Sequence, residues 1–235
     1  MSRSIEQQSE KRYPVVAWLV TLLVPVALVL TAVRLMMFPW FLTFEYSMPG
    51  FPDDQYGFTK QDRLYWSAVS LEYLLNDAKT TFVANLRFQD GTPVYNEREL
   101  LHMDDAKRAI QGALKAWKIA WLLLAALGLR AWFGKWWQTY LRSLGRGGWL
   151  TVFFVFGVIV FVVIGFSVFF VAFHQIFFNP GTWMFAWSDT FIRLFPERFW
   201  RDIFIYVGII SAAFGIILAL VTLGRPGRVS KPAAR

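Results

Sequence analysis

Two histidines, His102 and His174, are the only imidazole side chains in this chain of 235 residues. His174 follows Trp149–Phe173, an apolar run long enough to cross a bilayer, and His102 precedes another apolar run. An imidazole can accept or donate a proton near pH 7, so two of them together could carry general acid–base chemistry. We therefore predict one site built from two distant parts of the sequence.

Two carboxylates accompany His102 at helical spacing. Glu99, His102 and Asp105 are three residues apart, which makes them neighbours on one face of a helix. A neighbouring carboxylate fixes the tautomer of an imidazole and raises its basicity. The alternative is a solvated helix face, on which Glu99 only caps the helix and Asp105 pairs with a nearby base. For His174 the alternative is an interfacial residue in an aromatic belt, and spacing alone favours both alternatives.

Metal and nucleophile chemistry have little support. The chain contains no cysteine, which excludes disulfides, thiolate ligands and a cysteine nucleophile. Zinc usually takes three or four protein ligands, so Glu99, Asp105 or Asp189 would have to join the two histidines. Neither His-Glu-x-x-His nor Gly-x-Ser-x-Gly occurs in the sequence. We therefore expect a site that needs no metal.

The elements that position these residues are membrane helices. The chain is 56% hydrophobic, with 24 Phe and 12 Trp, which is more apolar than soluble domains usually are. Basic residues lie beside the apolar blocks, as topology determinants do, so the net charge of +8 does not indicate nucleic-acid binding. We predict a mainly α integral membrane protein with four transmembrane helices and a small mixed α/β extracytoplasmic cap. The expected order is a cytoplasmic N-terminus 1–14, crossing 15–38, cap 39–113, crossing 114–133, cytoplasmic loop 134–148, crossing 149–173, outer loop 174–203, crossing 204–223 and cytoplasmic tail 224–235.

The cap shows both helical and strand patterns. Thr59 followed by Asp62 predicts an N-cap with a helix beyond it. Residues 82–88 alternate between two sets of side chains, which is a strand pattern, and 93–95 would be a short returning strand. Between them, Asp90-Gly91 predicts a tight turn.

A second helix begins after Asn96, with Glu99 at the capping-box position. If this helix ran straight into the second crossing, His102 would stand far above the membrane face at which His174 lies. We therefore expect the helix to bend near Gly112.

Two motifs carry a resemblance to a known family. The first is Glu99-x-x-His102-Met103-x-Asp105-x-Lys107, leading into a membrane helix. The second is Phe173-His174-x-x-Phe177-Phe178, then Trp183, Asp189 and Leu194-Phe195-Pro196-Glu197-x-Phe199-Trp200. With four crossings and a large first outer loop, the chain resembles the lipoprotein intramolecular transacylase (Lit) family over nearly its whole length. One departure is Ala106, where we expect a valine.

The resemblance implies a reaction within one substrate. Such an enzyme would move the sn-2 acyl chain of a diacylglyceryl-cysteine to the α-amino group of the same cysteine, giving a lyso-form lipoprotein. Because acyl donor and acceptor belong to one substrate, it would need no soluble cofactor. Its partners would be the diacylglyceryl lipoprotein and membrane lipid, and no nucleic acid. We expect a monomer in the bacterial cytoplasmic membrane, with the site on the extracytoplasmic side and both termini in the cytoplasm.

In this interpretation His174 acts as base towards the amine, and His102 is the partner acid or electrophile. Arg34, near the outer end of the first crossing, could stabilise the oxyanion, because a charge at membrane depth usually has a function. Its alternative is snorkelling to the outer headgroups. The residues expected to orient these groups or bind substrate are Glu99, Asp105, Arg34 and Asp189.

Other functional classes stay open. A non-enzymatic membrane receptor or assembly factor with a small ectodomain fits the aromatic surface and basic tail equally well. A transporter has less support, because the sequence shows no inverted repeat and no charged pair inside the third or fourth crossing.

Overall fold

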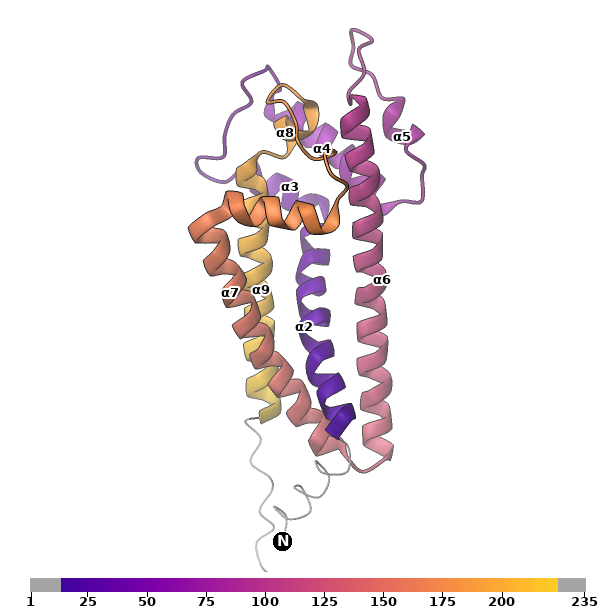
Figure 1. Cartoon of the computed structure of the whole chain (residues 1–235), viewed down its shortest axis with the longest axis vertical. Coiled ribbons are helices and arrows are strands. Elements are labelled where there is room, and N and C mark those ends of the chain that lie inside the picture. Colours follow the sequence, from indigo (N-terminus) through magenta and orange to yellow (C-terminus); the bar gives the residue numbers. More distant parts are fainter. Residues whose placement is uncertain (1–13, 224–235) are drawn as a thin grey trace, which may run out of the picture. The chain divides into compact units, whose positions relative to one another are not determined.

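The computed structural model describes residues 14–223, and every regular element in that range is a helix. Most of the predicted cytoplasmic N-terminus 1–14 and the whole tail 224–235 lie outside the described residues. In chain order the helices are α2 (Pro14–Met36), α3 (Pro39–Glu45), α4 (Lys60–Leu75), α5 (Thr81–Ala84), α6 (Glu97–Phe133), α7 (Trp137–Phe177), α8 (Thr190–Leu194) and α9 (Glu197–Leu223) (Figure 1).

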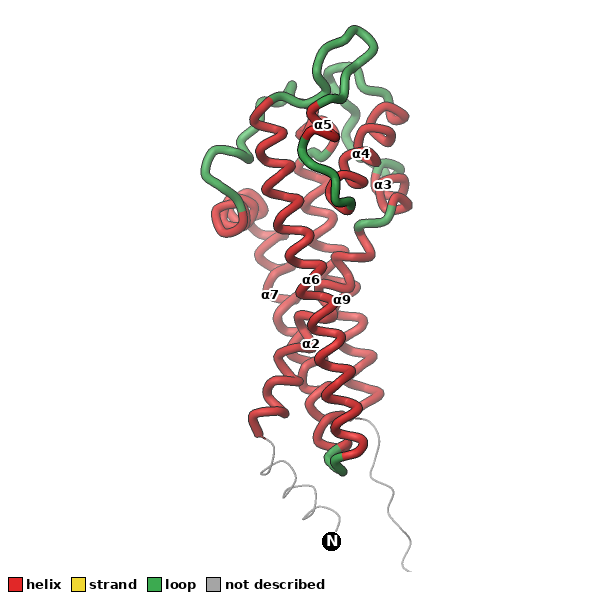
Figure 2. The backbone as a smooth tube through the Cα atoms, turned by 90° about the vertical axis from the view of Figure 1, so that its right-hand side faces the viewer, coloured by secondary structure: helices red, strands yellow, loops and turns green. Residues whose placement is uncertain are grey.

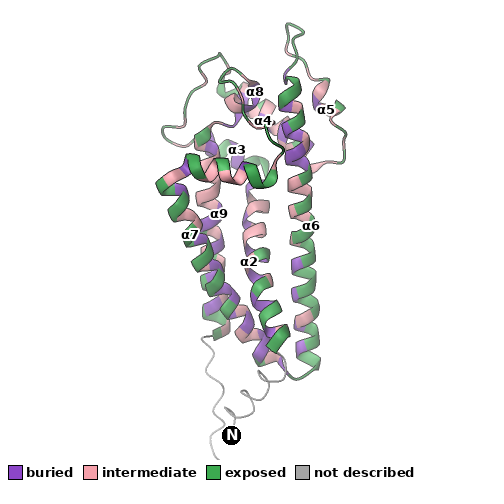
Figure 3. Cartoon of the chain, in the orientation of Figure 1, coloured by how far each residue is buried: buried purple, intermediate pink, exposed green. Residues whose placement is uncertain are grey.

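Four helices, α2, α6, α7 and α9, are long and apolar enough to cross a membrane. The predicted crossings coincide with them, although α6 and α7 extend well beyond the apolar stretches that revealed them. Many large apolar side chains on these helices are exposed, as lipid-facing residues would be (Figure 3).

The chain divides into two compact units, and each long helix contributes to both. The described part of the first, which we call the bundle unit, comprises residues 14–32, 116–158 and 208–223. The second, which we call the site unit, comprises residues 33–115 and 159–207.

Small residues bring helices together in the bundle unit. A Cβ atom added at Gly148 of α7 would lie 2.5 Å from the carbonyl oxygen of Gly215 of α9, so neither position has room for a side chain. The hydroxyl of Tyr140 donates to the carbonyl of Leu124 over 2.8 Å inside the apolar core. Close backbone approach of this kind is typical of helix pairs in membranes.

Local capping signals position the short helices of the site unit. Thr59 and Asp62 form the predicted capping box at the start of α4, which confirms that helix. The hydroxyl of Tyr46, just after α3, donates to the carbonyl of Leu194 over 2.6 Å. This bond ties two distant segments of the site unit together.

The mixed α/β cap is a wrong prediction, because the described residues contain no strand (Figure 2). Residues 81–84 form the short helix α5, and the expected strand pair is reduced to one isolated bridge between Arg87 and Pro93. Of the alternating residues only Val83 is buried, so the alternation does not mark a two-faced sheet. A two-stranded hairpin alone is marginal. The predicted turn is confirmed, with Gly91 at φ 84°.

The predicted bend near Gly112 is also wrong. Helix α6 continues through Gly112 without interruption. The change of direction lies in α7, where Gly165 departs from helical geometry at φ −148° and ψ 59°. Within the site unit, this break lies where the orange part of α7 begins in Figure 1. His174 lies in the part of α7 that follows Gly165.

Candidate functional site

The structure brings the two histidines together within the site unit. The ring centroids of His102, near the start of α6, and His174, near the end of α7, lie 5.9 Å apart, with planes inclined by 24°. Both are buried, with 3% and 7% of their surface exposed. The expectation that distant segments meet in one cluster is therefore met by the geometry.

His102 is enclosed by aromatic rings. The centroids of Phe178, Phe185 and Phe191 lie 4.9, 5.3 and 5.2 Å from its own. Its Nδ1 atom is buried and has no hydrogen-bond partner among the described residues. Burial of this kind favours the neutral imidazole, the form that can accept a proton.

A hydrogen bond fixes the tautomer of His174. Its Nδ1 atom lies 2.8 Å from the carbonyl oxygen of Phe170, which can only accept. The proton of a neutral His174 therefore lies on Nδ1, and Nε2 keeps a free lone pair. The ring also contacts Trp183, at a centroid distance of 4.9 Å.

Glu99 acts on His102 indirectly. Its carboxylate accepts hydrogen bonds from the backbone N–H groups of Asn96 (2.7 Å) and Phe191 (2.6 Å). The first bond belongs to the predicted capping box, which the reciprocal bond from the Glu99 N–H to Asn96 completes at 3.0 Å. The second holds Phe191, whose ring packs on His102. Glu99 thus caps the helix that carries His102 and anchors one wall of its enclosure.

Asp105 ties α6 to the segment that follows α7. It accepts hydrogen bonds from the amide of Asn179 (3.0 and 3.1 Å) and the hydroxyl of Thr182 (3.2 Å). It also forms an ion pair with Arg108, as the solvated-face interpretation expected. In the described part of the chain, no hydrogen bond joins Asp105 or Glu99 directly to His102.

Asp189 and Arg34 lie outside this contact cluster. Asp189 accepts hydrogen bonds from the backbone N–H of Ala186 (2.8 Å) and the amide of Asn96 (3.0 Å), so it connects the loop before α8 to the start of α6. Arg34 stacks on Phe38, at 4.3 Å from the ring centroid. One of its guanidinium nitrogens is buried without a partner in the described chain.

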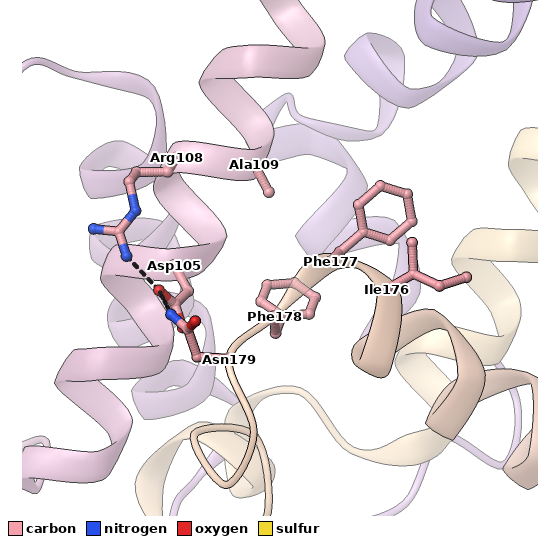
Figure 4. A pocket seen from close by; sticks show the side chains of 7 residues that line it. All are labelled: Asp105, Arg108, Ala109, Ile176, Phe177, Phe178 and Asn179. Carbon is pink, nitrogen blue, oxygen red and sulfur yellow. Dashed lines mark hydrogen bonds and ion pairs between the residues drawn. The ribbon is translucent and has the colours of Figure 1, made fainter.

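A cavity of about 380 Å³ lies beside Phe178, whose ring packs on both histidines. Its lining is Asp105, Arg108, Ala109, Ile176, Phe177, Phe178 and Asn179 (Figure 4). Figure 4 shows Arg108 and Asn179 converging on Asp105. Phe178 belongs both to the cavity wall and to the enclosure of the two histidines. Its side chain therefore connects the cavity wall to the histidine pair.

Sequence reasoning missed several residues of this site. Asn179, Thr182, Phe185 and Phe191 fall in loops or short elements where no spacing rule applies. The signal that could have found Asn179 is its position as a lone polar residue just past an apolar helix. Among the described residues, no three His, Asp or Glu side chains are grouped so that they could hold a metal ion.

Comparison with known proteins adds independent information. The sequence model of the family described as lipoprotein intramolecular transacylase Lit matches residues 18–200. A protein of Aquifex aeolicus (strain VF5), described as uncharacterized, is 27% identical over 185 residues, which cover 76% of this chain and 79% of that protein.

Solved structures show the same fold. The structure of the membrane integral lipoprotein intramolecular transacylase Lit from Bacillus cereus superposes with a TM-score of 0.70 at 20% identity, covering 88% of this chain and 94% of that one. A variant of that protein, with a histidine replaced by arginine, also gives 0.70, at 17% identity and with 95% and 96% covered.

Proposed function

Because the chain belongs to the lipoprotein intramolecular transacylase family, and is thus a multi-pass membrane acyltransferase, we propose that it transfers an acyl chain within a diacylglyceryl lipoprotein by His/His acid–base catalysis. The sn-2 acyl chain would pass from the glyceryl oxygen to the α-amino group of the N-terminal cysteine. The product would be the N-acyl, S-monoacylglyceryl lyso form. One observation carries the catalytic part: the two buried imidazoles lie 5.9 Å apart.

The protonation pattern supports a division of labour. The α-amino group titrates near ~8, so its nitrogen must lose a proton to become acylated. With Nδ1 held by the Phe170 carbonyl, Nε2 of His174 is free to accept that proton. As the new C–N bond forms and the ester C–O bond breaks, the proton taken up by His174 passes to the neutral His102, which delivers it to the departing glyceryl oxygen. The proton lost by the amine is the one gained by the alcohol, so no cofactor is consumed.

The remaining residues are assigned supporting roles in this proposal. Glu99 and Asp105 position the pair through the segments they hold, Phe191 and Asn179 respectively. Asp189 and Arg34 are proposed to bind substrate. The buried, unpartnered guanidinium nitrogen of Arg34 is a donor that an ester or glyceryl oxygen would satisfy.

We further propose that both termini are cytoplasmic and that segments 39–113 and 174–203 are extracytoplasmic, from the excess of Lys and Arg in the other segments. Reporter fusions after residues 90, 142, 190 and 235 should read outside, inside, outside and inside. An inside signal after residue 90 would contradict this topology. Both histidines come from one chain, so a monomer surrounded by membrane lipid is proposed to suffice.

The test is conversion of a diacylglyceryl lipopeptide by the purified enzyme, followed by mass spectrometry of the product. His102→Ala and His174→Ala should each lower the rate by about 10²–10⁴-fold, the usual contribution of acid–base catalysis. The double variant should be little worse, because residues that act as a unit are not additive. Near-normal conversion by either single variant would contradict the mechanism.

Metal independence belongs to the same experiment. The wild-type enzyme should keep its rate after chelator treatment, because two histidines without a third strong ligand hold zinc poorly. Loss of activity on chelation, restored by zinc, would replace the acid–base proposal with a metal-assisted one.

A further inference from the structure

Trp183 presents an unpaired hydrogen-bond donor beside the histidine pair. Its ring lies 4.9 Å from that of His174, with planes inclined by 38°. Its indole Nε1 atom is buried and has no acceptor among the described residues. An indole N–H can only donate, and buried donors are nearly always paired. This exception occurs next to the base of the proposed reaction.

Acyl transfer creates a need for such a donor. Attack by the amine converts the ester carbonyl into a tetrahedral centre whose oxygen carries a negative charge. Enzymes stabilise that oxyanion with preorganised N–H donors aimed at it. A donor that stays unpaired until substrate arrives requires no rearrangement when the charge develops.

The other groups around the pair are poor candidates for this task. The rings of Phe178, Phe185 and Phe191 carry no donor, and the backbone N–H of Phe191 is already bound by Glu99. The Thr182 hydroxyl is bound to Asp105.

Two other side-chain donors, Asn179 and Arg34, are also poor candidates for binding the oxyanion. The Asn179 amide is held by Asp105. Arg34, which the sequence favours, contacts Phe38 and shares no ring contact or hydrogen bond with either histidine in the described chain.

We propose that Trp183 is a catalytic residue whose Nε1–H donates a hydrogen bond to the oxyanion formed from the sn-2 ester carbonyl. The assignment rests on the transacylase reaction proposed above. It requires the reacting carbonyl to lie between the base, His174, and the edge of the indole that carries the N–H. No bond beyond those of the transfer itself is made or broken.

The test replaces the N–H without changing the ring. Site-specific incorporation of benzothienylalanine at position 183 exchanges the indole N–H for sulfur and keeps the shape of the side chain. Trp183→Phe is the second variant, and Trp187→Phe is the matched control, because Trp187 belongs to the same loop and is 71% exposed. For each protein, kcat and KM are measured with the diacylglyceryl lipopeptide, together with the Tm.

Both variants at 183 should lose about 10²–10³-fold in kcat, as other enzymes do when one oxyanion donor is removed. Their KM should stay within about twofold, and the control should match the wild type. Equal kcat for the benzothienylalanine protein and the wild type would overturn the assignment, even if Trp183→Phe is impaired, because the ring and not its N–H would then matter. A rise in KM at unchanged kcat would also overturn it.

Failure of the underlying reaction has a different signature. If the wild-type enzyme itself formed no lyso product, the proposed function and this role of Trp183 would both be overturned. A normal wild-type rate with normal variants would overturn the Trp183 role alone.

Discussion

The Nδ1 atom of His174 lies 2.8 Å from the carbonyl oxygen of Phe170, one helical turn earlier in α7. A backbone carbonyl cannot donate, so this contact determines which ring nitrogen carries the proton. The helix thereby leaves Nε2 of the neutral ring without a proton. The tautomer that this contact implies can be tested by NMR.

We predict that neutral His174 is the Nδ1–H tautomer. With only two histidines in the chain, ¹⁵N-histidine labelling gives two ring systems, and His102→Asn assigns them. The ¹⁵N shifts should show a protonated Nδ1 and an unprotonated Nε2 for His174. A dominant Nε2–H form would remove the basis for assigning it as the base.

Asp105→Asn should lower the transfer rate about tenfold, because a weaker bond to Asn179 and Thr182 loosens the segment that carries Phe178. Asn179→Ala should have a similar effect, and the double variant should resemble either single one, since both disturb the same contact. Asp104→Asn is the control, because Asp104 is more exposed and points to Thr80 and Arg108. Additive losses from the two changes would show that Asp105 acts on something else.

Glu99→Ala should destabilise the protein as well as lower the rate of acyl transfer. The change leaves the backbone N–H groups of Asn96 and Phe191 without acceptors. The Phe191 N–H is buried, and leaving such a group unpaired costs about 1–3 kcal/mol, so the Tm in detergent should fall clearly. Glu97→Ala, in the same helical turn but exposed, should leave the Tm unchanged. A stable Glu99→Ala protein without activity would point to a direct chemical role.

Glu45 should make stability depend on pH. It is fully buried, and this burial, with the nearby charge of Asp202, raises its pKa from 4.5 to about 7. The folded state therefore keeps the Glu45 proton up to a higher pH than the unfolded chain does. Its destabilising effect is absent below pH 4.5, grows as the pH rises from 4.5 to 7, and is complete above about 7, where it amounts to about 3 kcal/mol. Glu45→Gln should flatten the dependence of Tm on pH, and an unchanged slope would contradict the assignment.

Gly148→Leu should prevent normal folding of the bundle unit. A side chain at Gly148 would collide with the backbone of Gly215, so α7 and α9 would have to separate. Gly157→Leu on the same helix is the control, because a Cβ atom there meets nothing within 4 Å. Thermal stability in detergent measures both variants. Equal Tm values for the two proteins would mean that the close approach contributes nothing.

The sequence predicts what is set by neighbours in the chain. The capping pair Thr59–Asp62 and the cap at Glu99 are local, so residue types and spacing suffice for them. The four long apolar helices follow from length and hydropathy in the same way. The predicted strand at 82–88 does not form, because alternation specifies a strand only when a partner strand is present. Here the pairing consists of one isolated bridge.

The bend was placed in the wrong helix for a comparable reason. Gly112 and Gly165 are equally permissive in sequence, and only packing decides which one interrupts its helix. The proximity of His102 and His174 could be predicted because histidine is rare in this chain. The rings around His102 could not be predicted, because Phe185 and Phe191 lie in segments whose path no spacing rule describes.

The break at Gly165 makes the direction of His174 depend on the length of the stretch 166–173. The histidine that follows is presented at an angle set by how many residues of helix separate it from the break. Exchanging one apolar residue for another within this stretch keeps that angle. Inserting or deleting a single residue would rotate His174 by about 100° around the helix axis and carry it away from His102. The length of this segment is therefore constrained, and related chains should keep its residue count.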